Sequence, residues 1–371
     1  MMRPTNSSRI HFPDLDATRF LAFFLVFLYH VLNTKTGEIA DSGFYHLLRS
    51  HIPIAHIGVN YFFTLSSFLI SYLLLSEIKE TKSVKIGYFL IRRILRIWPL
   101  YFSILLFAFV VLPKLYFFVD PNASITLPDL LPFLLFYSNF YIINHGVEFV
   151  FVLTILWTIS VEEQFYLVWP FISKYGTKYF AAICWGLFII AGLSPFFIRS
   201  ELAFFHSITY LSNFGIGGLA AYLVVENHSF LEQIKKLNRW KIFAIYFAVI
   251  CLCLLYPYWT DSLLITSLSS SVLALFYAFV ILEQSFSDHS ILKLRKFRFG
   301  TYAGKLSYGL YVFQGLVLSA LGFVGVSFFN NSSVGFYLVK PLLAFAFCLG
   351  IAHLSFKYLE TPFLRLKSNY R

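Results

Sequence analysis

Long runs of apolar residues alternate with short polar and basic segments along the whole chain. Ten of these runs are about 18–23 residues long, the length that an α-helix needs to cross a bilayer. We predict a membrane helix for each run: 15–33, 54–76, 97–117, 149–171, 178–199, 205–226, 241–258, 263–283, 303–325 and 336–358. The pattern therefore predicts an all-α polytopic membrane protein with about ten transmembrane helices.

A further apolar run, residues 130–143, is shorter and contains Pro132, Ser138 and Asn139. The positive charges decide its interpretation, because Lys and Arg are enriched in cytoplasmic loops. If this run does not cross the membrane, every strongly basic segment falls on one side. If it crosses, the rule fails for the second half of the chain. We therefore expect a re-entrant or interfacial segment here, and both termini in the cytoplasm.

The composition is that of a protein embedded in a membrane along most of its length. Of its 371 residues, 58% are hydrophobic and 13% are charged, about half the charged fraction of a soluble domain. The net charge is +11, but the basic residues cluster in short loops, so we expect no nucleic-acid binding. The four cysteines have no zinc spacing, so we expect no metal. We expect one membrane domain, 1–371 with a core at 12–365, and no separate soluble domain.

The first apolar run carries ionisable residues at both ends. Arg19 and His30 are eleven positions apart, about 16 Å along nearly one helix face, and Asp16 lies one turn before Arg19. An ionisable residue at membrane depth is costly, so it usually has a partner or a function. His30 is a candidate general base, although it could be a solvated histidine at the outer helix end. Arg19 could equally form a structural ion pair with Asp14 or Asp16.

Two later segments also carry charges close to or within predicted spans. Arg92, Arg93 and Arg96 precede a span on the predicted cytoplasmic side. Guanidinium groups suit phosphate, but such arginines also anchor helices to lipid headgroups. Glu162 and Glu163 lie within a span, and two adjacent carboxyl groups cannot share one helix face. At least one should face the protein interior, where a structural pair and a catalytic role are both open.

Four further polar residues are weaker candidates. Ser66 lies among small residues of the second span, where close helix packing is the simpler interpretation; a serine nucleophile is possible, but no GxSxG motif surrounds it. Tyr308 and Gln314 lie in a late span. Glu360 lies at the inner end of the last span, where it could cap a helix or pair with an arginine.

Taken together, six segments resemble, in order, the motifs of the acyltransferase-3 family of integral membrane O-acyltransferases. They are DLDATRFLAFFLVFLYH, GVNYFFTLSSFLI, RRILRIWPLY, LWTISVEEQFYLVWP, GKLSYGLYVFQ and YLETPF. The resemblance covers almost the whole chain. Three positions depart from the family pattern: Asn60 stands where the family usually has an acid, and Ser67 where it usually has glycine. Gln314 stands where many members have a second histidine.

The resemblance implies transfer of an acyl group, often acetyl, from cytoplasmic acyl-CoA to a hydroxyl of a sugar, glycolipid, polysaccharide or small molecule. It implies the stand-alone form of the family, in the bacterial inner membrane. It implies His30 as the catalytic base and ranks Glu162 above Glu163. Donor binding is assigned to Arg19, Arg92, Arg93 and Arg96. Substrate contact or support is assigned to Asp16, Glu163, Ser66, Tyr308, Gln314 and Glu360.

We expect the CoA phosphates to bind at the cytoplasmic arginines and the thioester to reach His30 near the outer half of the membrane. Glu162, or an acid near it, could orient the imidazole as the acid of a triad does. The alternative is a secondary transporter or flippase for a lipid-linked sugar, although no internal repeat supports it. A non-catalytic membrane assembly subunit is a third interpretation. The sequence does not name the acceptor.

Overall fold

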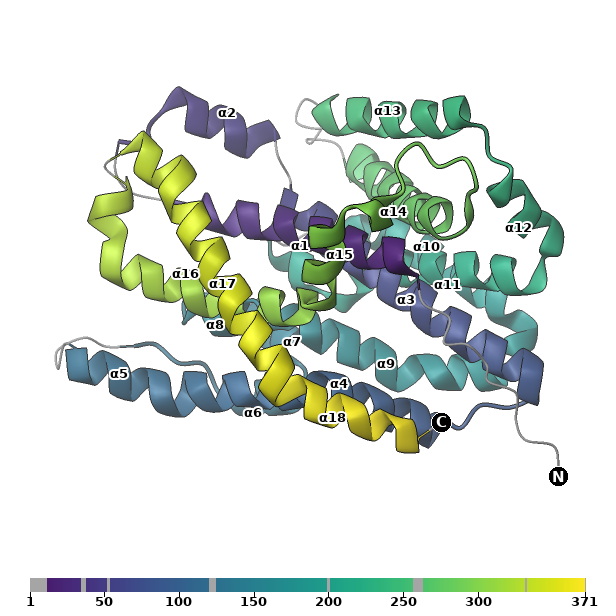
Figure 1. Ribbon diagram of the computed structural model, residues 1–371, viewed down its shortest axis with the longest axis horizontal. Coiled ribbons are helices and arrows are strands. Elements are labelled where there is room, and N and C mark those ends of the chain that lie inside the picture. Colours follow the sequence, from purple (N-terminus) through teal and green to yellow (C-terminus); the bar gives the residue numbers. More distant parts are fainter. Residues whose placement is uncertain are drawn as a thin grey trace.

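The computed structural model describes residues 12–34, 38–51, 54–119, 125–198, 201–255, 263–330 and 332–370, and it contains no strand in these ranges. A long helix lies at each of the ten predicted runs (Figure 1). These helices are α1 (Pro13–Val31), α3 (Ile54–Thr81), α4 (Ile86–Leu106), α9 (Trp157–Tyr175), α10 (Phe180–Phe197), α11 (Leu211–Glu226), α13 (Arg239–Leu255), α14 (Leu263–Phe286), α16 (Ser307–Asn330) and α17 (Lys340–Ser355). The all-α prediction is confirmed.

Short helices extend several of the long ones. A π-helical segment, Phe107–Val111, joins α4 to α5 (Leu112–Val119). On the N-terminal side of α9 lies α8 (Phe151–Thr154), and α18 (Thr361–Leu366) follows α17 through a second π-helical segment, Phe356–Glu360. These extensions lengthen the apolar rods that can span a bilayer.

Seven helical stretches in the described ranges are long and apolar enough to cross a membrane. They are Ile57–Thr81, Ile86–Phe118, Phe151–Tyr175, Thr177–Phe197, Ser207–Glu226, Ser269–Phe286 and Gly335–Asn369. The helix α1 is not among these seven stretches, because three charged residues, Asp14, Asp16 and Arg19, lie in its first turns. The protein is therefore an integral membrane protein, whereas the number of ten crossings stays a prediction.

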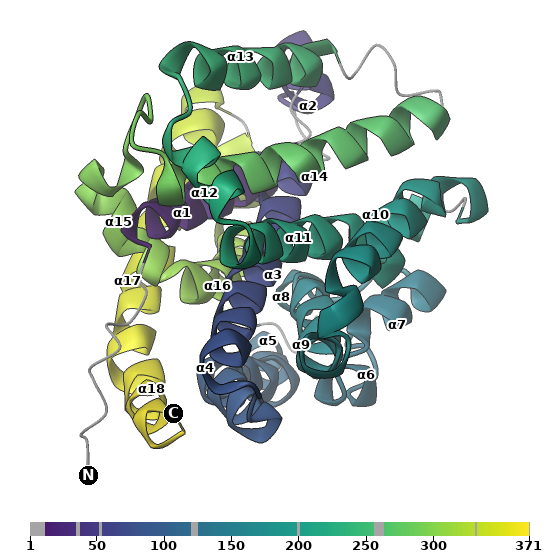
Figure 2. The ribbon, with the colours of Figure 1, turned by 90° about the vertical axis from the view of Figure 1, so that its right-hand side faces the viewer.

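The central helix of the bundle is α3, which packs against α1, α9, α11 and α14 (Figure 2). Burial separates inner from outer helices: 67% of the apolar window is buried in the α11 stretch, but only 22% in the α10 stretch. Small residues allow the inner helices to approach closely. A Cβ on Gly217 of α11, for example, would lie 2.4 Å from the Thr64 carbonyl oxygen of α3.

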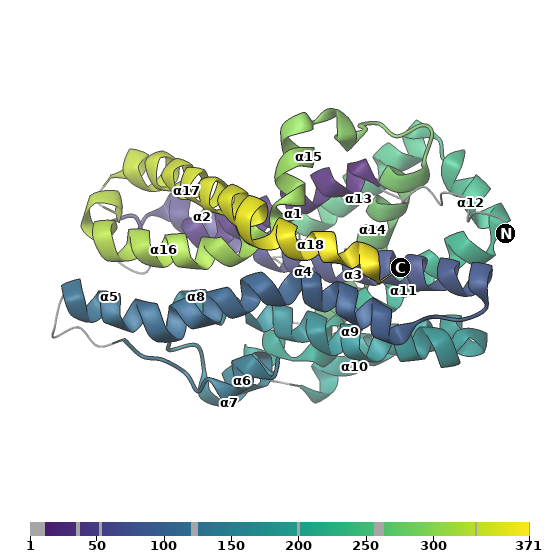
Figure 3. The same cartoon turned by 60° about the horizontal axis from the view of Figure 1, so that its bottom comes forward.

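The first residues of α1 and the end of α18 lie toward the same end of the long axis in Figure 1. The connection between α16 and α17 lies toward the other end, as does α2 (Gly43–His51). Figure 3 shows α18 lying across α4, with which it is in contact, whereas α17 packs against α16. The helices α1 and α16 therefore run in the same direction, away from the end of the molecule where α18 ends.

Residues 130–143 form two short helices rather than one long one. These are α6 (Leu131–Leu134) and α7 (Ser138–His145), and the turn between them places Phe136 at a φ of 56°. Tyr101 donates a hydrogen bond to the Phe133 carbonyl at 2.8 Å, and Gln164 donates one to the Phe136 carbonyl at 2.9 Å. An eight-residue helix is only about 12 Å long. The segment is therefore too short and too bent to form one membrane-length helix, and side chains of α4 and α9 bond two of its carbonyls. Whether it is re-entrant or interfacial stays a prediction.

Candidate active site

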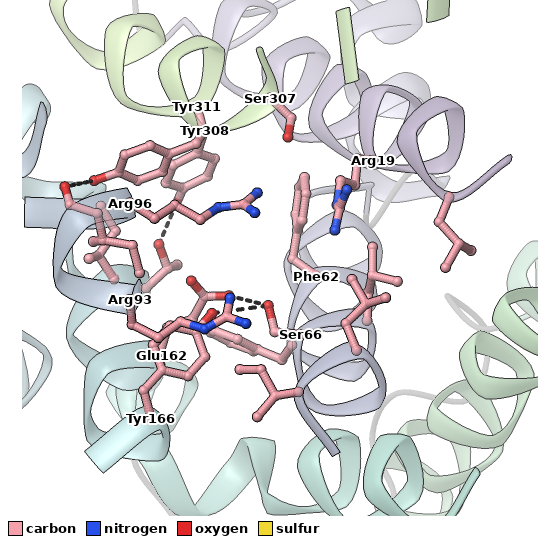
Figure 4. A pocket seen from close by; sticks show the side chains of 18 of the residues that line it. Arg19, Phe62, Ser66, Arg93, Arg96, Glu162, Tyr166, Ser307, Tyr308 and Tyr311 are labelled. Atoms are coloured by element: carbon pink, nitrogen blue, oxygen red, sulfur yellow. Dashed lines mark hydrogen bonds between the residues drawn. The ribbon is translucent and has the colours of Figure 1, made fainter. Parts of the chain in front are cut away.

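A cavity of about 300 Å³ lies between α1, α3, α4, α9 and α16 (Figure 4). Each of the five helices contributes at least one polar side chain to it. The polar lining consists of Asp16, Arg19, Ser66, Arg93, Arg96, Thr158, Glu162, Tyr166, Ser307, Tyr308 and Tyr311. The fold thus brings five of the six sequence motifs together at one site.

Three arginines dominate the charge of this cavity. Arg93 and Arg96 reach it from α4, and Arg19 reaches it from α1 on the opposite side (Figure 4). Arg19 forms an ion pair with Asp16 at 2.7 Å, so the structural pair left open by the sequence is present. Within the described part of the chain, neither Arg93 nor Arg96 has a carboxylate within 4.0 Å or a hydrogen bond, and Arg93 Nε is buried without a partner. Unpaired guanidinium groups in the interior favour an anionic ligand.

Glu162 faces the cavity, whereas Glu163 faces away from it. Ser66 Oγ donates a hydrogen bond to Glu162 Oε1 at 2.7 Å, and Tyr166 donates one to Ser66 Oγ at 3.3 Å. Glu163 instead accepts a hydrogen bond from Trp98 Nε1 at 3.2 Å. Adjacent helical residues are rotated by about 100°, which separates the two carboxyl groups. Tyr166 was not among the predicted site residues, although its spacing of four from Glu162 could have identified it.

Two tyrosines of α16 form another wall of the cavity. Tyr308 donates a hydrogen bond to the Ile97 carbonyl of α4 at 2.8 Å. Tyr311 donates one to the Ile155 carbonyl at 3.1 Å and accepts one from Thr158 at 2.9 Å. These contacts hold α16 against α4 and against the α8–α9 rod. Tyr308 therefore occupies a position suited to the predicted supporting role, and that role stays a prediction.

His30 lies near the opposite end of α1 and is not part of the cavity lining. Its ring packs against Phe151, with 5.0 Å between ring centroids, and is partly buried. Arg49 of α2 lies close by, because its guanidinium stacks on Tyr29 at 4.2 Å. Glu162 is eleven residues from Phe151, about 16 Å along a helix, and its bonded partner is Ser66. The structure therefore does not support the expectation that Glu162 orients the imidazole.

Three other predicted residues lie outside the cavity lining. Arg92 donates a hydrogen bond to the Tyr370 carbonyl at 2.7 Å, so a different partner already occupies it. Glu360 is buried and accepts a hydrogen bond from Ser355 at 3.2 Å. Gln314 is fully buried within α16. In the part of the chain that the structure covers, no group of three or more His, Cys, Asp or Glu residues could hold a metal ion.

Comparison with known proteins agrees with the motifs that meet at this cavity. A family model described as an acyltransferase domain matches residues 12–353. The chain belongs to the acyltransferase-3 family. No solved structure matches this acyltransferase-3 chain.

Curated relatives of this family member are named O-acetyltransferases. Peptidoglycan O-acetyltransferase OatA of Listeria monocytogenes is 31% identical over 176 residues, 46% of this chain and 25% of that protein. A putative O-acetyltransferase of Staphylococcus aureus is 26% identical over 340 residues, 86% of this chain and 54% of that protein. O-acetyltransferase OatA of Staphylococcus aureus is 28% identical over 171 residues, 44% of this chain. The matches thus span between 25% and 54% of these relatives' own lengths.

Proposed function

We propose that this protein is a membrane O-acyltransferase that moves an acetyl group from cytoplasmic acetyl-CoA to a hydroxyl of a cell-envelope glycan such as peptidoglycan. Family membership and the names of the relatives support acyl transfer to oxygen. The observation that supports the CoA donor is that, in the described residues, Arg93 and Arg96 have no carboxylate within 4.0 Å and no hydrogen bond. Partly buried guanidinium groups that lack a bonded carboxylate favour a ligand with several negative charges. The phosphates of CoA have this chemistry.

The donor would lie along α1 and α16, with its phosphates at the arginines and its thioester toward His30. Arg19, which lines the cavity, is eleven residues from His30 on the same helix. That separation is about 16 Å along the axis, a distance that an extended pantetheine arm can bridge. Glu162 and Ser66 would support the donor end of this path, where Glu162 offsets part of the arginine charge.

At the outer end of the path, the His30 imidazole would accept the proton of the acceptor hydroxyl. The hydroxyl oxygen would then form a bond to the carbonyl carbon of the thioester, and the carbon–sulfur bond would break. The proton would pass from the imidazolium to the departing thiolate. This scheme needs neither a metal nor an acyl-enzyme intermediate.

We propose further that all ten long helices cross the bacterial inner membrane, with both termini in the cytoplasm and residues 12–365 as one membrane domain. The basic loops support this orientation. It would place Arg93 and Arg96 toward the cytoplasm, where acetyl-CoA is available. It would place His30 toward the outer face, where envelope glycans are found.

The test is an assay of the purified protein in detergent with radiolabelled acetyl-CoA and a soluble peptidoglycan fragment. We expect the wild type to transfer label to the fragment. His30→Ala should lower transfer by about 100-fold or more, because a general base contributes that much. Its affinity for acetyl-CoA should be unchanged, since His30 lies outside the arginine cavity. His228→Ala, an exposed residue of α12 (His228–Lys235), is the matched control.

Two outcomes of this assay would contradict the proposal. If folded wild-type protein leaves all label on CoA, with the fragment and with water alike, acyl transfer is wrong and a transporter becomes the better interpretation. If folded His30→Ala transfers label at nearly the wild-type rate, His30 is not the base.

A further inference from the structure

Gln314 of α16 is an unusual buried residue. Its side chain is fully buried, and among the described residues neither its carboxamide oxygen nor its nitrogen has a hydrogen-bond partner. Leaving a buried amide unbonded is unfavourable, and each such group in a folded protein needs an explanation. The fold thus keeps a free hydrogen-bond donor and acceptor inside the helix bundle.

The position of Gln314 along α16 relates it to the cavity. Ser307, Tyr308 and Tyr311 line the cavity from this helix, and Gln314 follows Tyr311 by three residues, or about 4.5 Å along the axis. Three residues on a helix also keep two side chains on neighbouring parts of one face. Gln314 therefore lies immediately beyond the wall that Tyr311 forms.

The next residue, Gly315, shows what this turn of α16 packs against. A Cβ at Gly315 would lie 2.9 Å from the Cα of Val152 and 2.7 Å from Ile155 Cδ1. Phe151, the neighbour of Val152, contacts the ring of His30. The short helix α8 thus touches both the Gln314 turn of α16 and the imidazole end of α1.

The positions of these residues along the axes of α1 and α16 agree with that placement. Arg19 of α1 and Ser307 of α16 both line the cavity, and the two helices run in the same direction from it. Gln314 is seven residues beyond Ser307, about 10 Å, whereas His30 is eleven beyond Arg19, about 16 Å. Along the helix axes, Gln314 therefore lies farther from the arginines than Ser307 does and not as far as His30.

We propose that the Gln314 carboxamide is a catalytic oxyanion donor: its Nε2–H group bonds the acyl carbonyl oxygen while the thioester is attacked. This inference rests on the proposed function. As the hydroxyl oxygen bonds to the carbonyl carbon, negative charge moves onto the carbonyl oxygen, and the Gln314 N–H stabilises it. When the carbon–sulfur bond breaks, the carbonyl double bond forms again and the negative charge leaves on the thiolate sulfur. A carboxamide suits the role because it carries no charge and does not compete with His30 for the proton.

The decisive variant is Gln314→Leu, which keeps a side chain of comparable size without polar atoms. Because the native amide has no partner to lose, the unfolding midpoint should stay the same or rise. Affinity for acetyl-CoA measured without acceptor should change less than about twofold, since the arginines are intact. Transfer to the peptidoglycan fragment should fall about 100-fold, as it does when an oxyanion donor is removed. Hydrolysis of acetyl-CoA without acceptor should fall in parallel, because it passes through the same oxyanion.

Two further variants separate this role from a structural one. Gln284→Leu is the matched control, because Gln284 is also buried but bonds Glu283 at 2.7 Å and the Leu292 carbonyl at 3.1 Å. It should lower the unfolding midpoint. Gln314→His retains an N–H donor and should keep more transfer activity than Gln314→Leu.

The outcomes distinguish this inference from the proposed function. If the wild-type protein neither transfers the acetyl group nor hydrolyses acetyl-CoA, both the proposed function and this inference are wrong. An active wild type with an equally active Gln314→Leu would remove the inference alone. Loss of transfer with undiminished hydrolysis would place Gln314 at the acceptor and contradict the oxyanion role. A lowered midpoint with an unchanged rate would make Gln314 structural.

Discussion

Arg92 and Arg93 are adjacent in the sequence, yet their guanidinium groups have different surroundings. Arg93 lines the cavity and lies over the Tyr166 ring at 5.6 Å. Arg92 donates to the Tyr370 carbonyl and lies 3.9 Å from Glu77. The rotation of about 100° between adjacent helical residues accounts for this difference. The two arginines therefore provide a matched comparison on one helix.

We predict that Arg93→Ala weakens acetyl-CoA binding by about 10-fold or more, because a hydrogen bond to a charged group contributes about 1.5–3 kcal/mol. Arg92→Ala should change the affinity by less than about twofold. Isothermal titration calorimetry in detergent measures both, with the unfolding midpoint as a check on folding. Equal losses in the two variants would show that acetyl-CoA does not bind in this cavity.

At the scale of elements, the close contact between α3 and α11 supports the wall of the cavity that carries Ser66. Ser67 Oγ donates to the Phe214 carbonyl at 2.5 Å, and Asn213 donates to Thr64 Oγ1 at 3.0 Å. Gly217 lets the backbones meet, since its Cβ position is 2.4 Å from the Thr64 carbonyl oxygen. In a bilayer, such small-residue packing and interhelical hydrogen bonds hold helices together.

Gly217→Ala is expected to lower the free energy of unfolding by about 1–3 kcal/mol, because the added methyl group forces α3 and α11 apart. Transfer activity should fall with it, since α3 carries Ser66. The matched control is Gly186→Ala on α10, where nothing lies within 4 Å of the new Cβ. Thermal unfolding in the same detergent compares the two, and equal midpoints would refute the packing argument.

At the scale of the whole molecule, the proposed mechanism depends on which end of the bundle faces the cytoplasm. The α3–α4 connection, with exposed Ser83, is on the proposed cytoplasmic side. The turn between α1 and α2, with exposed Asp41, is on the proposed outer side. Charge asymmetry in loops sets the orientation of a membrane protein as it inserts.

We predict that Asp41→Cys reacts with a membrane-impermeant maleimide on intact spheroplasts. Ser83→Cys should react only after the membrane is permeabilised. The parent protein gives the background from its four native cysteines, which lie buried or half-buried in helices. The reverse labelling pattern would contradict the orientation and would place the arginine cavity on the wrong side for cytoplasmic acetyl-CoA.

Much of the candidate site could be predicted because it depends on local helix geometry. Arg93 and Arg96 are three residues apart, a spacing that places two side chains on one helix face, and both line the cavity. Thr158 and Glu162 share a face at a spacing of four, and both line it as well. Spacing along a single helix is fixed by the backbone, so these pairs needed no knowledge of neighbouring helices.

The sequence by itself determined where the helices form and that the protein lies in a membrane. The physical reason is that a bilayer demands long apolar runs whose backbone groups are bonded within the helix. The tertiary structure alone decided that Glu162 bonds Ser66, that the His30 ring packs against Phe151, and that Gln314 has no hydrogen-bond partner among the described residues. Each of these depends on which distant helices pack together and on how far each is shifted along its axis. Close contacts at small residues, such as Gly217 against α3 and Gly315 against α8, fix that packing, and no local sequence pattern does.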